Sequence, residues 1–371
     1  MHRKRHMRSR AALALLLALL AIFPGCIVAQ FFIGYPLYHA AKPFQRAHAD
    51  ALGRKRAEQW TDSSILDGEG GYVYILEHQP CSLWHHLKRY DVRSGEWHVF
   101  EDLDIQYGAL DIASDLLACT LPYDDVNRLR STGVFALPDC RPLMTLPDSF
   151  AAVAVDPSGK FLAVLDKGDR EPVPYPAGRR KYYRVDIKCR LEIFAIPSGE
   201  EVFEYPECVR SHGIAWSPDS SAIAFTSFHD KDLFKQNPDE MGRYISDYRP
   251  WSPPPVIHIC DLATGTTTEH VSGMYPQWSP DSARLLFEDA DSNVSMYELE
   301  TGHVTTLFPT CDFLPGYYKK FQWSPTGKNV AMTFKRGRGA SDSDLAVVNV
   351  LQPERRFLLA SEWCSLCDWT K

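Results

Sequence analysis

The sequence predicts an all-β protein, a six-bladed β-propeller with four-stranded blades. A Trp-Ser-Pro motif recurs along the chain, a short apolar run follows each copy, and four strand-length segments separated by turns fit between copies. Self-similarity of this kind is typical of repeat folds, in which each unit buries its apolar surface against its neighbours. The copies begin at Trp216, Trp278 and Trp323, and a weaker fourth begins at Val155.

Each unit reads as four short strands in order. An apolar first strand ends at the Trp, and a tight turn follows because Pro presets φ and small polar residues accept the bend. A second strand comes next, and a third strand ends in a turn closed by Gly, which readily adopts φ > 0. The expected second strands are 161–164, 222–225, 284–287 and 329–332, and the Gly turns are 91–95, 196–199, 261–265 and 298–302.

The number of blades follows from the anchor residue of each first strand. Six anchors follow one another at intervals of 45 to 62 residues, which predicts six blades. Residues 72–101 supply second, third and fourth strands without a first, whereas residues 364–371 supply a first strand alone. We therefore expect strand exchange between the termini to close the ring and remove its exposed edges, with residues 59–63 as the alternative closing strand. The anchors are Leu110, Val155, Trp216, Trp278, Trp323 and Trp369.

These blocks resemble the TolB-type, WD-like propeller repeats of bacterial proteins. The usual form of that repeat is Trp-Ser-Pro-Asp-Gly-Lys before an Ile-Ala-Phe strand, and the resemblance covers roughly residues 65 to 371. Leu110 and Val155 stand where that family usually has Trp. The resemblance implies the propeller fold and leaves the function open, because propellers serve as scaffolds, substrate gates and enzymes alike.

The N-terminus is predicted to carry an export signal. Residues 2–10 contain five Lys or Arg, and residues 11–23 form an apolar core, which together are typical of a secretory signal. The positive flank stays in the cytoplasm and directs the rest of the chain outward. We therefore expect a signal peptide or hydrophobic anchor helix over 1–34, a stalk or linker over 35–64, and an extracytoplasmic propeller over 65–371, in the periplasm or at the cell surface.

Three fates remain open for this N-terminal segment. Phe23-Pro24-Gly25-Cys26 resembles a bacterial lipoprotein signal, in which Cys26 would be acylated. Residues 27–34 are still mostly apolar, so the segment could instead span the bilayer uncleaved. Plain cleavage near Ala29 is the third. The first two fates leave the protein attached to the membrane.

The charge of the chain argues against a nucleic-acid partner. There are 40 Lys and Arg against 47 Asp and Glu, a formal net charge of −7. Without the five cations of the signal region the charge becomes −7 − 5 = −12. An acidic surface repels a phosphate backbone.

Extra length in the third and fourth blades is the main functional lead. The insertions 167–188 and 228–255 both fall between second and third strands, so we expect them on the same face of the ring. They are rich in Tyr, Trp and Arg, the side chains that most often anchor interfaces. The alternative is that they are solvated insertions packed on their own residues. The predicted binding residues are Arg180, Tyr182, Tyr183, Arg184, His212, Tyr244, Arg249 and Trp251.

No catalytic residue, metal site or cofactor is predicted. His212 is expected near the pore mouth, where Met274 and Lys319 hold the equivalent positions in the next two blades. One branch of the resembled family, the oligogalacturonate lyases, uses pore histidines to hold a metal, and with one His in this ring of positions such a site lacks ligands. Residues 288–293 alternate carboxylates as a calcium loop does, yet Val294 replaces the required Gly, which favours a solvated acidic turn.

The cysteines are interpreted as mainly structural. Cys119 and Cys260 lie in apolar strands and are expected to be buried thiols. Cys364 and Cys367 superficially match a redox motif, but residues three apart in a strand point to opposite faces. The other cysteines could form disulfides, in a pattern that spacing does not determine.

The sequence therefore favours a membrane-tethered, non-catalytic scaffold that binds a protein or cell-envelope partner through its inserted loops. The alternative is an enzyme, a lyase or hydrolase acting on an envelope polymer or glycan at the pore mouth. It predicts that His212, Lys319 and the acidic turn 288–293 converge with carboxylates in a deep polar pocket. A Gly-x-Ser-x-Gly elbow is absent from the sequence.

Overall fold

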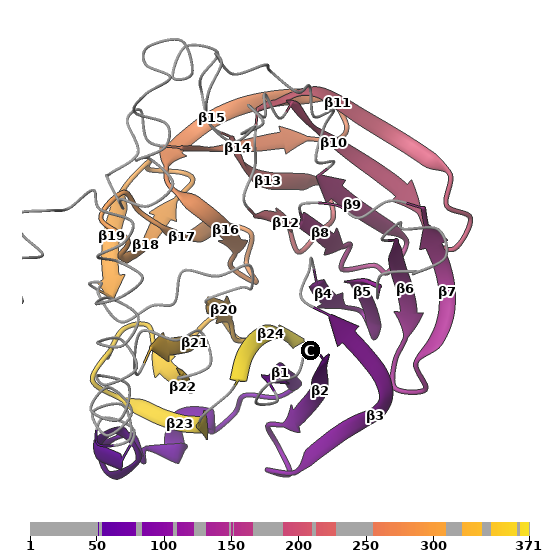
Figure 1. Cartoon of the computed structure of the whole chain (residues 1–371). Coiled ribbons are helices and arrows are strands. Elements are labelled where there is room, and N and C mark those ends of the chain that lie inside the picture. The colour runs from indigo at the N-terminus through magenta and orange to yellow at the C-terminus, as the bar shows by residue number, and fades with distance from the viewer. Residues whose placement is uncertain are drawn as a thin grey trace, which may run out of the picture. The chain divides into compact units, whose positions relative to one another are not determined.

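A computed structural model describes residues 51, 54–78, 84–106, 110–121, 131–147, 150, 152–165, 188–209, 213–227, 255–308, 321–335, 343–361 and 364–370. Lys55–Lys371 forms one compact unit. Its strands make six four-stranded antiparallel sheets arranged in a ring (Figure 1), which confirms the predicted six-bladed propeller.

The blades follow one another along the chain. Blade one contains β24 (Cys364–Thr370), β1 (Tyr72–His78), β2 (Trp84–Asp91) and β3 (Trp97–Gln106). Blade two contains β4 (Leu110–Ala113), β5 (Leu116–Thr120), β6 (Thr132–Ala136) and β7 (Arg141–Leu146). Blade three contains β8 (Ala152–Val155), β9 (Phe161–Leu165), β10 (Lys188–Ala195) and β11 (Glu201–Val209). Blade four contains β12 (Ile214–Trp216), β13 (Ala222–Ser227), β14 (Val256–Asp261) and β15 (Thr266–Ser272). Blade five contains β16 (Met274–Trp278), β17 (Arg284–Glu288), β18 (Val294–Glu298) and β19 (Val304–Phe308). Blade six contains β20 (Phe321–Trp323), β21 (Asn329–Lys335), β22 (Ser343–Asn349) and β23 (Arg356–Ser361), and a short 3-10 helix, η2 (Ser63–Leu66), precedes blade one.

The C-terminal strand closes the ring. β24 pairs antiparallel with β1, with Trp369 opposite Val73, and so becomes the first strand of blade one (Figure 1). Residues 59–63, the alternative closing strand, do not pair with β1; there Thr61 makes a single bridge to Phe357 of β23. Strand exchange between the termini is confirmed, and the C-terminus supplies the closing strand.

The core is divided among the blade interfaces. Six hydrophobic clusters of described residues are present, and each lies between two neighbouring blades. Between blades three and four, for example, Ala154 and Leu165 pack against Trp216 and Phe225. Because every blade buries both faces against its neighbours, no blade has a complete core of its own.

The anchor Trp residues cross these interfaces. The indole Nε1 of Trp216 donates to the carbonyl of Ala154 in the previous blade at 2.9 Å. Trp278 and Trp323 repeat the contact with the blades before them, at 3.2 and 3.3 Å. A buried indole N–H requires an acceptor, so the recurrent Trp both fills the interface and is hydrogen bonded across it.

Blade two departs from the predicted register. Its first strand begins at Leu110, the expected anchor, and ends three residues later at Ala113. A two-residue turn of Ser114 and Asp115, with φ of 50° and 58°, joins it to β5. Such a turn needs positive φ at both positions, which Asp and Ser accept at a cost. In the other blades the anchor pairs with the second residue of the second strand. In blade two that residue is Leu117, which pairs with Ile112. Ile112 is therefore the anchor position of blade two, and the Trp-Ser-Pro turn is replaced by a tighter one.

Cys119 and Cys260 are buried, as predicted. Burial raises the pKa of the Cys119 thiol to about 12. The thiolate is the reactive form, so Cys119 is expected to resist iodoacetamide at pH 8 in the native protein, whereas the half-buried Cys140 reacts. Peptide mapping after timed labelling checks this, with urea-unfolded protein as the control. Equal labelling rates of the two native thiols would contradict the burial.

Residues 55–69, which we call the N-terminal strap, run along the outer edge of blade six. Arg56 forms an ion pair with Asp344 at the start of β22 at 3.1 Å, and both side chains are buried, 5% and 0% exposed. The Trp60 carbonyl then accepts a hydrogen bond from the backbone of β23. Part of the segment 35–64, expected as a linker, thus packs on the ring and covers the edge of its last blade.

The strap ends by completing a turn of blade six. The Glu69 carboxylate accepts hydrogen bonds from the Ser324 hydroxyl at 2.8 Å, from the Thr326 hydroxyl, and from the Asn329 amide at 2.9 Å. Glu69 is 6% exposed. A buried carboxylate needs such donors, so the strap is fixed at this end as well.

No helix among the described residues is long and apolar enough to cross a bilayer. Residues 1–50, which contain the predicted signal or anchor helix and Cys26, lie outside them.

Candidate functional site

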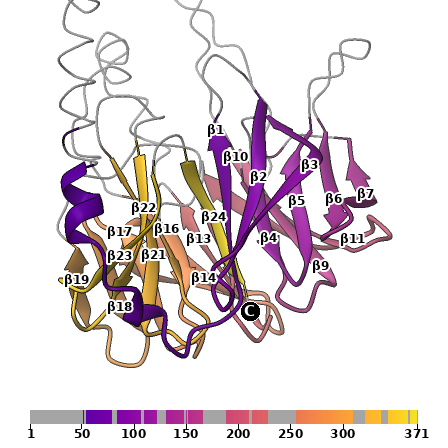
Figure 2. The same cartoon turned by 90° about the horizontal axis from the view of Figure 1, so that it is seen from below.

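The two faces of the ring differ in their connections. In each antiparallel blade the first-to-second and third-to-fourth turns lie at one end, which we call the turn face. The second-to-third and fourth-to-first connections lie at the other end, the loop face (Figure 2). Insertion 167–188 leads from β9 to β10, and insertion 228–255 leads from β13 to β14. Both insertions therefore leave from the loop face, in adjacent blades, as the sequence predicts.

The residues that the sequence selected on this face lie outside the described residues. This holds for the whole predicted binding set and for Lys319. The set is Arg180, Tyr182, Tyr183, Arg184, His212, Tyr244, Arg249 and Trp251. Their assignment to binding therefore stays a prediction, and the structure describes only the strands from which they project.

The base of the blade-four insertion is held firmly. His258 of β14 is 8% exposed and stacks on Phe225 of β13, with ring centroids 5.5 Å apart. The Thr226 hydroxyl accepts a hydrogen bond from the backbone N–H of Tyr275 in blade five at 3.3 Å. Gly213 is required beside it, because a Cβ there would come 2.9 Å from the Tyr275 Cα. The insertion thus starts from a rigid junction of two blades, which the sequence alone did not reveal.

The acidic turn is ordered by its own donors. Asp289 accepts hydrogen bonds from the backbone N–H groups of Asp291 and Asn293, at 3.0 and 2.9 Å. Its second oxygen accepts from the Asn293 amide and the Ser295 hydroxyl, at 3.0 and 2.8 Å. Within the described part of the chain no group of three or more His, Cys, Asp or Glu is placed to hold a metal ion. The turn is a structural connection between β17 and β18.

On the turn face, the Asp of the Trp-Ser-Pro-Asp motif is held by hydrogen bonds from residues of its own turn. In blade four the Asp219 carboxylate accepts hydrogen bonds from the Ser217 hydroxyl at 2.6 Å, and from the N–H and hydroxyl of Ser221 at 3.1 and 2.8 Å. Hydrogen bonds from Ser217 and then from Ser221 lower the pKa of Asp219. Asp219 is therefore an anion throughout the neutral range.

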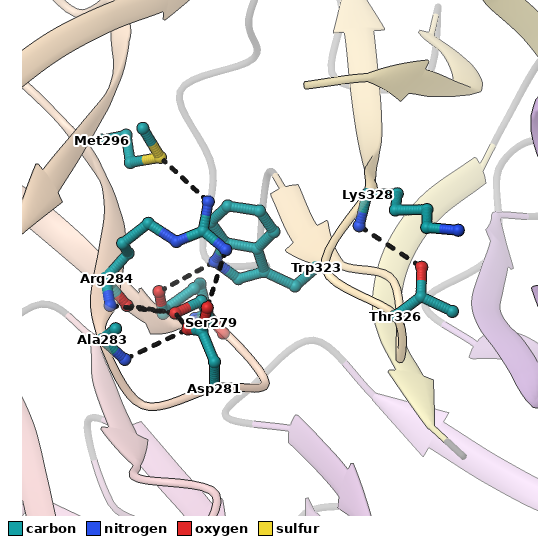
Figure 3. A network of polar contacts seen from close by, with 9 residues as sticks. Ser279, Asp281, Ala283, Arg284, Met296, Trp323, Thr326 and Lys328 are labelled. Carbon is teal, nitrogen blue, oxygen red and sulfur yellow. Dashed lines mark hydrogen bonds and ion pairs between the residues drawn. The ribbon is translucent and has the colours of Figure 1, made fainter. Parts of the chain in front are cut away.

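In blade five an arginine also contacts the equivalent carboxylate, that of Asp281 (Figure 3). The Arg284 guanidinium contacts the Asp281 carboxylate at 2.9 Å and lies over the Trp323 ring of blade six, 5.2 Å from its centroid. It also donates toward the Met296 sulfur at 4.0 Å. Gly327 of blade six lies beside it with φ of 71°, and a Cβ there would be in ordinary van der Waals contact with the guanidinium, at 3.8 Å. Arg284 thus fills the gap between blades five and six.

The Asp281 contacts make a pH-dependent contribution to stability. Burial raises the pKa of Asp281, but hydrogen bonds from Ser279 and Ala283 and the charge of Arg284 outweigh it, so the pKa lies below its ordinary value. A lowered pKa means a contribution that is present above the unfolded value and lost as pH falls through the folded one. Asp281→Asn is expected to cost about 1 kcal/mol at pH 7. The deficit relative to wild type should shrink at pH 3, as measured by urea unfolding, and a pH-independent deficit would contradict the assignment.

A groove lies at the corresponding place between blades four and five. Its volume is about 380 Å³, and it opens on the turn face. Its lining includes Asp219, Ala222, Asp261, Thr268, Trp278 and Ser282. The sequence analysis did not identify this groove. One signal was present in the sequence, because Ala222 is a small residue at the position that Arg284 occupies in blade five.

Comparisons with known proteins agree with the geometry of the ring. The structure of TolB from Acinetobacter baumannii matches 83% of this chain and 70% of its own, with a TM-score of 0.54 at 15% identity. The chain has a TolB-type propeller fold. A putative TolB from Agrobacterium tumefaciens matches 80% of this chain and 98% of its own, with a TM-score of 0.49 at 11% identity. Hydrazine synthase from Kuenenia stuttgartiensis matches 72% of this chain and 73% of its own, with a TM-score of 0.42 at 13% identity.

No family model and no curated protein matches the sequence. At these identities the likeness to TolB concerns the fold alone, since one propeller fold hosts many functions. The resemblance inferred from the Trp-Ser-Pro blocks is confirmed at that level, and the function has to be argued from the faces of the ring.

Proposed function

We propose that this protein is a non-catalytic scaffold that binds a protein or cell-envelope partner through its loop face. The observation that carries the proposal is that the insertions 167–188 and 228–255 are second-to-third connections of adjacent blades. The strands that flank them therefore end on one side of the ring, in adjacent blades. Binding segments on rigid frameworks are commonly arranged in this way.

The packing of the strands that carry these insertions supports a binding role. Blades three and four are joined by one cluster in which Leu165, Leu191, Ile223 and Phe225 are at most 1% exposed. A rigid base lowers the conformational entropy lost when the projecting segments bind. In this proposal Arg180, Tyr182, Tyr183 and Arg184 contact the partner from blade three. Tyr244, Arg249 and Trp251 contact it from blade four, with His212 beside them.

We place the ring outside the cytoplasm, tethered through the N-terminal segment. The basic residues 2–10 and the apolar residues 11–23 support export. The tether is the apolar helix itself or a lipid on Cys26. The partner is accordingly a protein or polymer of the cell envelope.

Cross-linked co-purification from intact membranes tests the proposal. Wild type is compared with a variant lacking residues 231–249 and with a matched variant in which those residues are replaced by a Gly/Ser linker of equal length. We expect a defined partner with wild type and its loss from both variants, because the side chains of the insertion make the contact.

The two variants separate the possible failures. Recovery with the linker variant but not with the deletion would mean that loop length, not its Tyr, Trp and Arg residues, matters. Recovery of the same proteins with all three chains would refute the loop-face proposal. Far-UV circular dichroism and the thermal midpoint confirm that each variant is folded.

A further inference from the structure

The first residue of the second strand occupies the same place in four blades. It stands six residues after the first-strand anchor, on the turn face, and in blades three to five it lies next to the anchor Trp of the following blade. The residues are Phe161 in blade three, Ala222 in blade four, Arg284 in blade five and Asn329 in blade six. The repeat therefore allows four equivalent sites to be compared within one chain.

Three of these sites are filled from within the protein. The Phe161 ring stacks against Trp216, with centroids 6.4 Å apart and planes at 25°. The Arg284 guanidinium lies over Trp323 at 5.2 Å (Figure 3). The Asn329 amide donates to the carbonyl of Ile65 in the N-terminal strap at 2.8 Å. Each interface is thus closed at its turn-face end by a side chain or by the strap.

The fourth site is open. Ala222 carries a single methyl group where the others carry larger side chains, and the groove of about 380 Å³ lies beside it. Trp278 forms one wall and is 9% exposed. Ser282 lines the groove at the position where blade six has Gly327 against the Arg284 guanidinium. The shape of the groove thus repeats the space that Arg284 fills one interface further on.

The type of side chain that fills each site depends on the residue at the Asp position of the motif in the same blade. Blade five has Asp281 and is filled by Arg284, whereas blade three has Ser158 at the Asp position and is filled by a phenyl ring. Blade four has Asp219, as in blade five, without an arginine. By comparison with blade five, where Asp281 pairs with Arg284, the blade-four site is suited to a cation.

The carboxylates of the groove are available to such a cation. All three hydrogen bonds to Asp219 end on its Oδ1, and among the described residues none reaches its Oδ2. Asp261, which pairs with Ala222 in the same blade, also lines the groove and likewise accepts from Thr264 through Oδ1 alone. The Thr264 backbone and hydroxyl lower the pKa of Asp261. Two ionised groups and an indole wall therefore face one opening.

We propose that the groove between blades four and five binds an arginine side chain of a partner polypeptide, in the position that Arg284 takes between blades five and six. A guanidinium suits the site better than an ammonium because its plane stacks on indole while its N–H groups reach a carboxylate. The groove is at the lower end of the volumes of small-ligand sites, about 300–1,000 Å³. It lies on the turn face and is independent of the loop-face proposal.

The test uses the folded full chain and a small probe. N-acetyl-arginine methylamide is titrated into the protein while tryptophan indole resonances are followed by NMR, with N-acetyl-citrulline methylamide as the uncharged control. We expect saturable binding of the arginine probe with a Kd on the order of 1 mM. The citrulline probe should bind at least roughly tenfold more weakly, because it lacks the charge that the carboxylates recognise.

Three variants assign that binding to the groove. Ala222→Arg places an internal guanidinium in the site and is expected to abolish binding and raise the thermal midpoint. Asp219→Asn is expected to weaken binding roughly tenfold. Arg284→Ala empties the neighbouring site and is expected to create a second binding site with the same preference for arginine.

Several results would overturn the proposal. They are equal binding of the two probes, absence of saturable binding to wild type, and unchanged binding by Ala222→Arg or Asp219→Asn. If Ala222→Arg fails to fold, Asp219→Asn and the gain of a site in Arg284→Ala still decide the question.

Discussion

Removal of residues 364–371 is expected to abolish the folded ring. β24 is the first strand of blade one, and within it Leu366 and Trp369 are 0% and 4% exposed. Both belong to the cluster between blades six and one, and the Trp369 indole donates to the Gly70 carbonyl at 3.1 Å. Without β24, β1 keeps an unpaired edge and the two blades lose their common core.

The expected loss is comparable to the whole stability of a domain. Truncating one large core side chain costs about 2–5 kcal/mol, while total stabilities are about 5–15 kcal/mol. The truncated chain should show no cooperative urea unfolding and should be digested rapidly by protease. Leu366→Ala is the milder control, which should fold with a stability lowered by about 2–4 kcal/mol. A truncated chain that unfolds cooperatively at the wild-type midpoint would show that β24 does not close the ring.

Arg56→Ala is expected to be the most destabilising single substitution in the N-terminal strap. It leaves the Asp344 carboxylate, 0% exposed, without the guanidinium 3.1 Å away. Breaking a buried ion pair on one side costs about 3–5 kcal/mol, because the remaining charge stays buried. The free energy of urea unfolding measures the effect.

A second ion pair in the strap provides the matched control. Arg355 and Asp62 are 2.8 Å apart, but both side chains are 36% exposed. Arg355→Ala should therefore cost less than about 1 kcal/mol. Replacing both Arg56 and Asp344 by Met and Leu should recover much of the loss, because no unpaired charge remains. Equal costs for Arg56→Ala and Arg355→Ala would show that burial of the first pair is unimportant.

The repeat itself was readable from the sequence, because its signals are local. Trp278, the Ser-Pro turn and the following apolar run lie within ten residues, and their geometry repeats in blades four to six. The anchor of blade two was placed two residues too early, at Leu110 instead of Ile112, because its hairpin turns at Ser114 and Asp115 without a Gly or Pro to mark it.

The features that were missed depend on contacts across blades. Arg56 meets Asp344 over 288 positions of the chain, and no local pattern links them. The groove requires Ala222 of one blade to stand beside Trp278 of the next, a neighbourhood that only the closed ring creates. The candidate binding residues of the loop face were chosen by composition, so they wait for the partner experiment.

The contact between Glu69 and blade six has a consequence for how such chains diverge. Blades four and five carry their own carboxylate, Asp219 or Asp281, for the motif serine, whereas blade six has Thr326 there and receives the carboxylate from Glu69. A repeat can therefore lose a motif residue without losing its interaction when another part of the chain replaces it. Positions 69 and 326 are expected to covary. In a related sequence with Asp at position 326, an acidic residue at position 69 is no longer required for this contact.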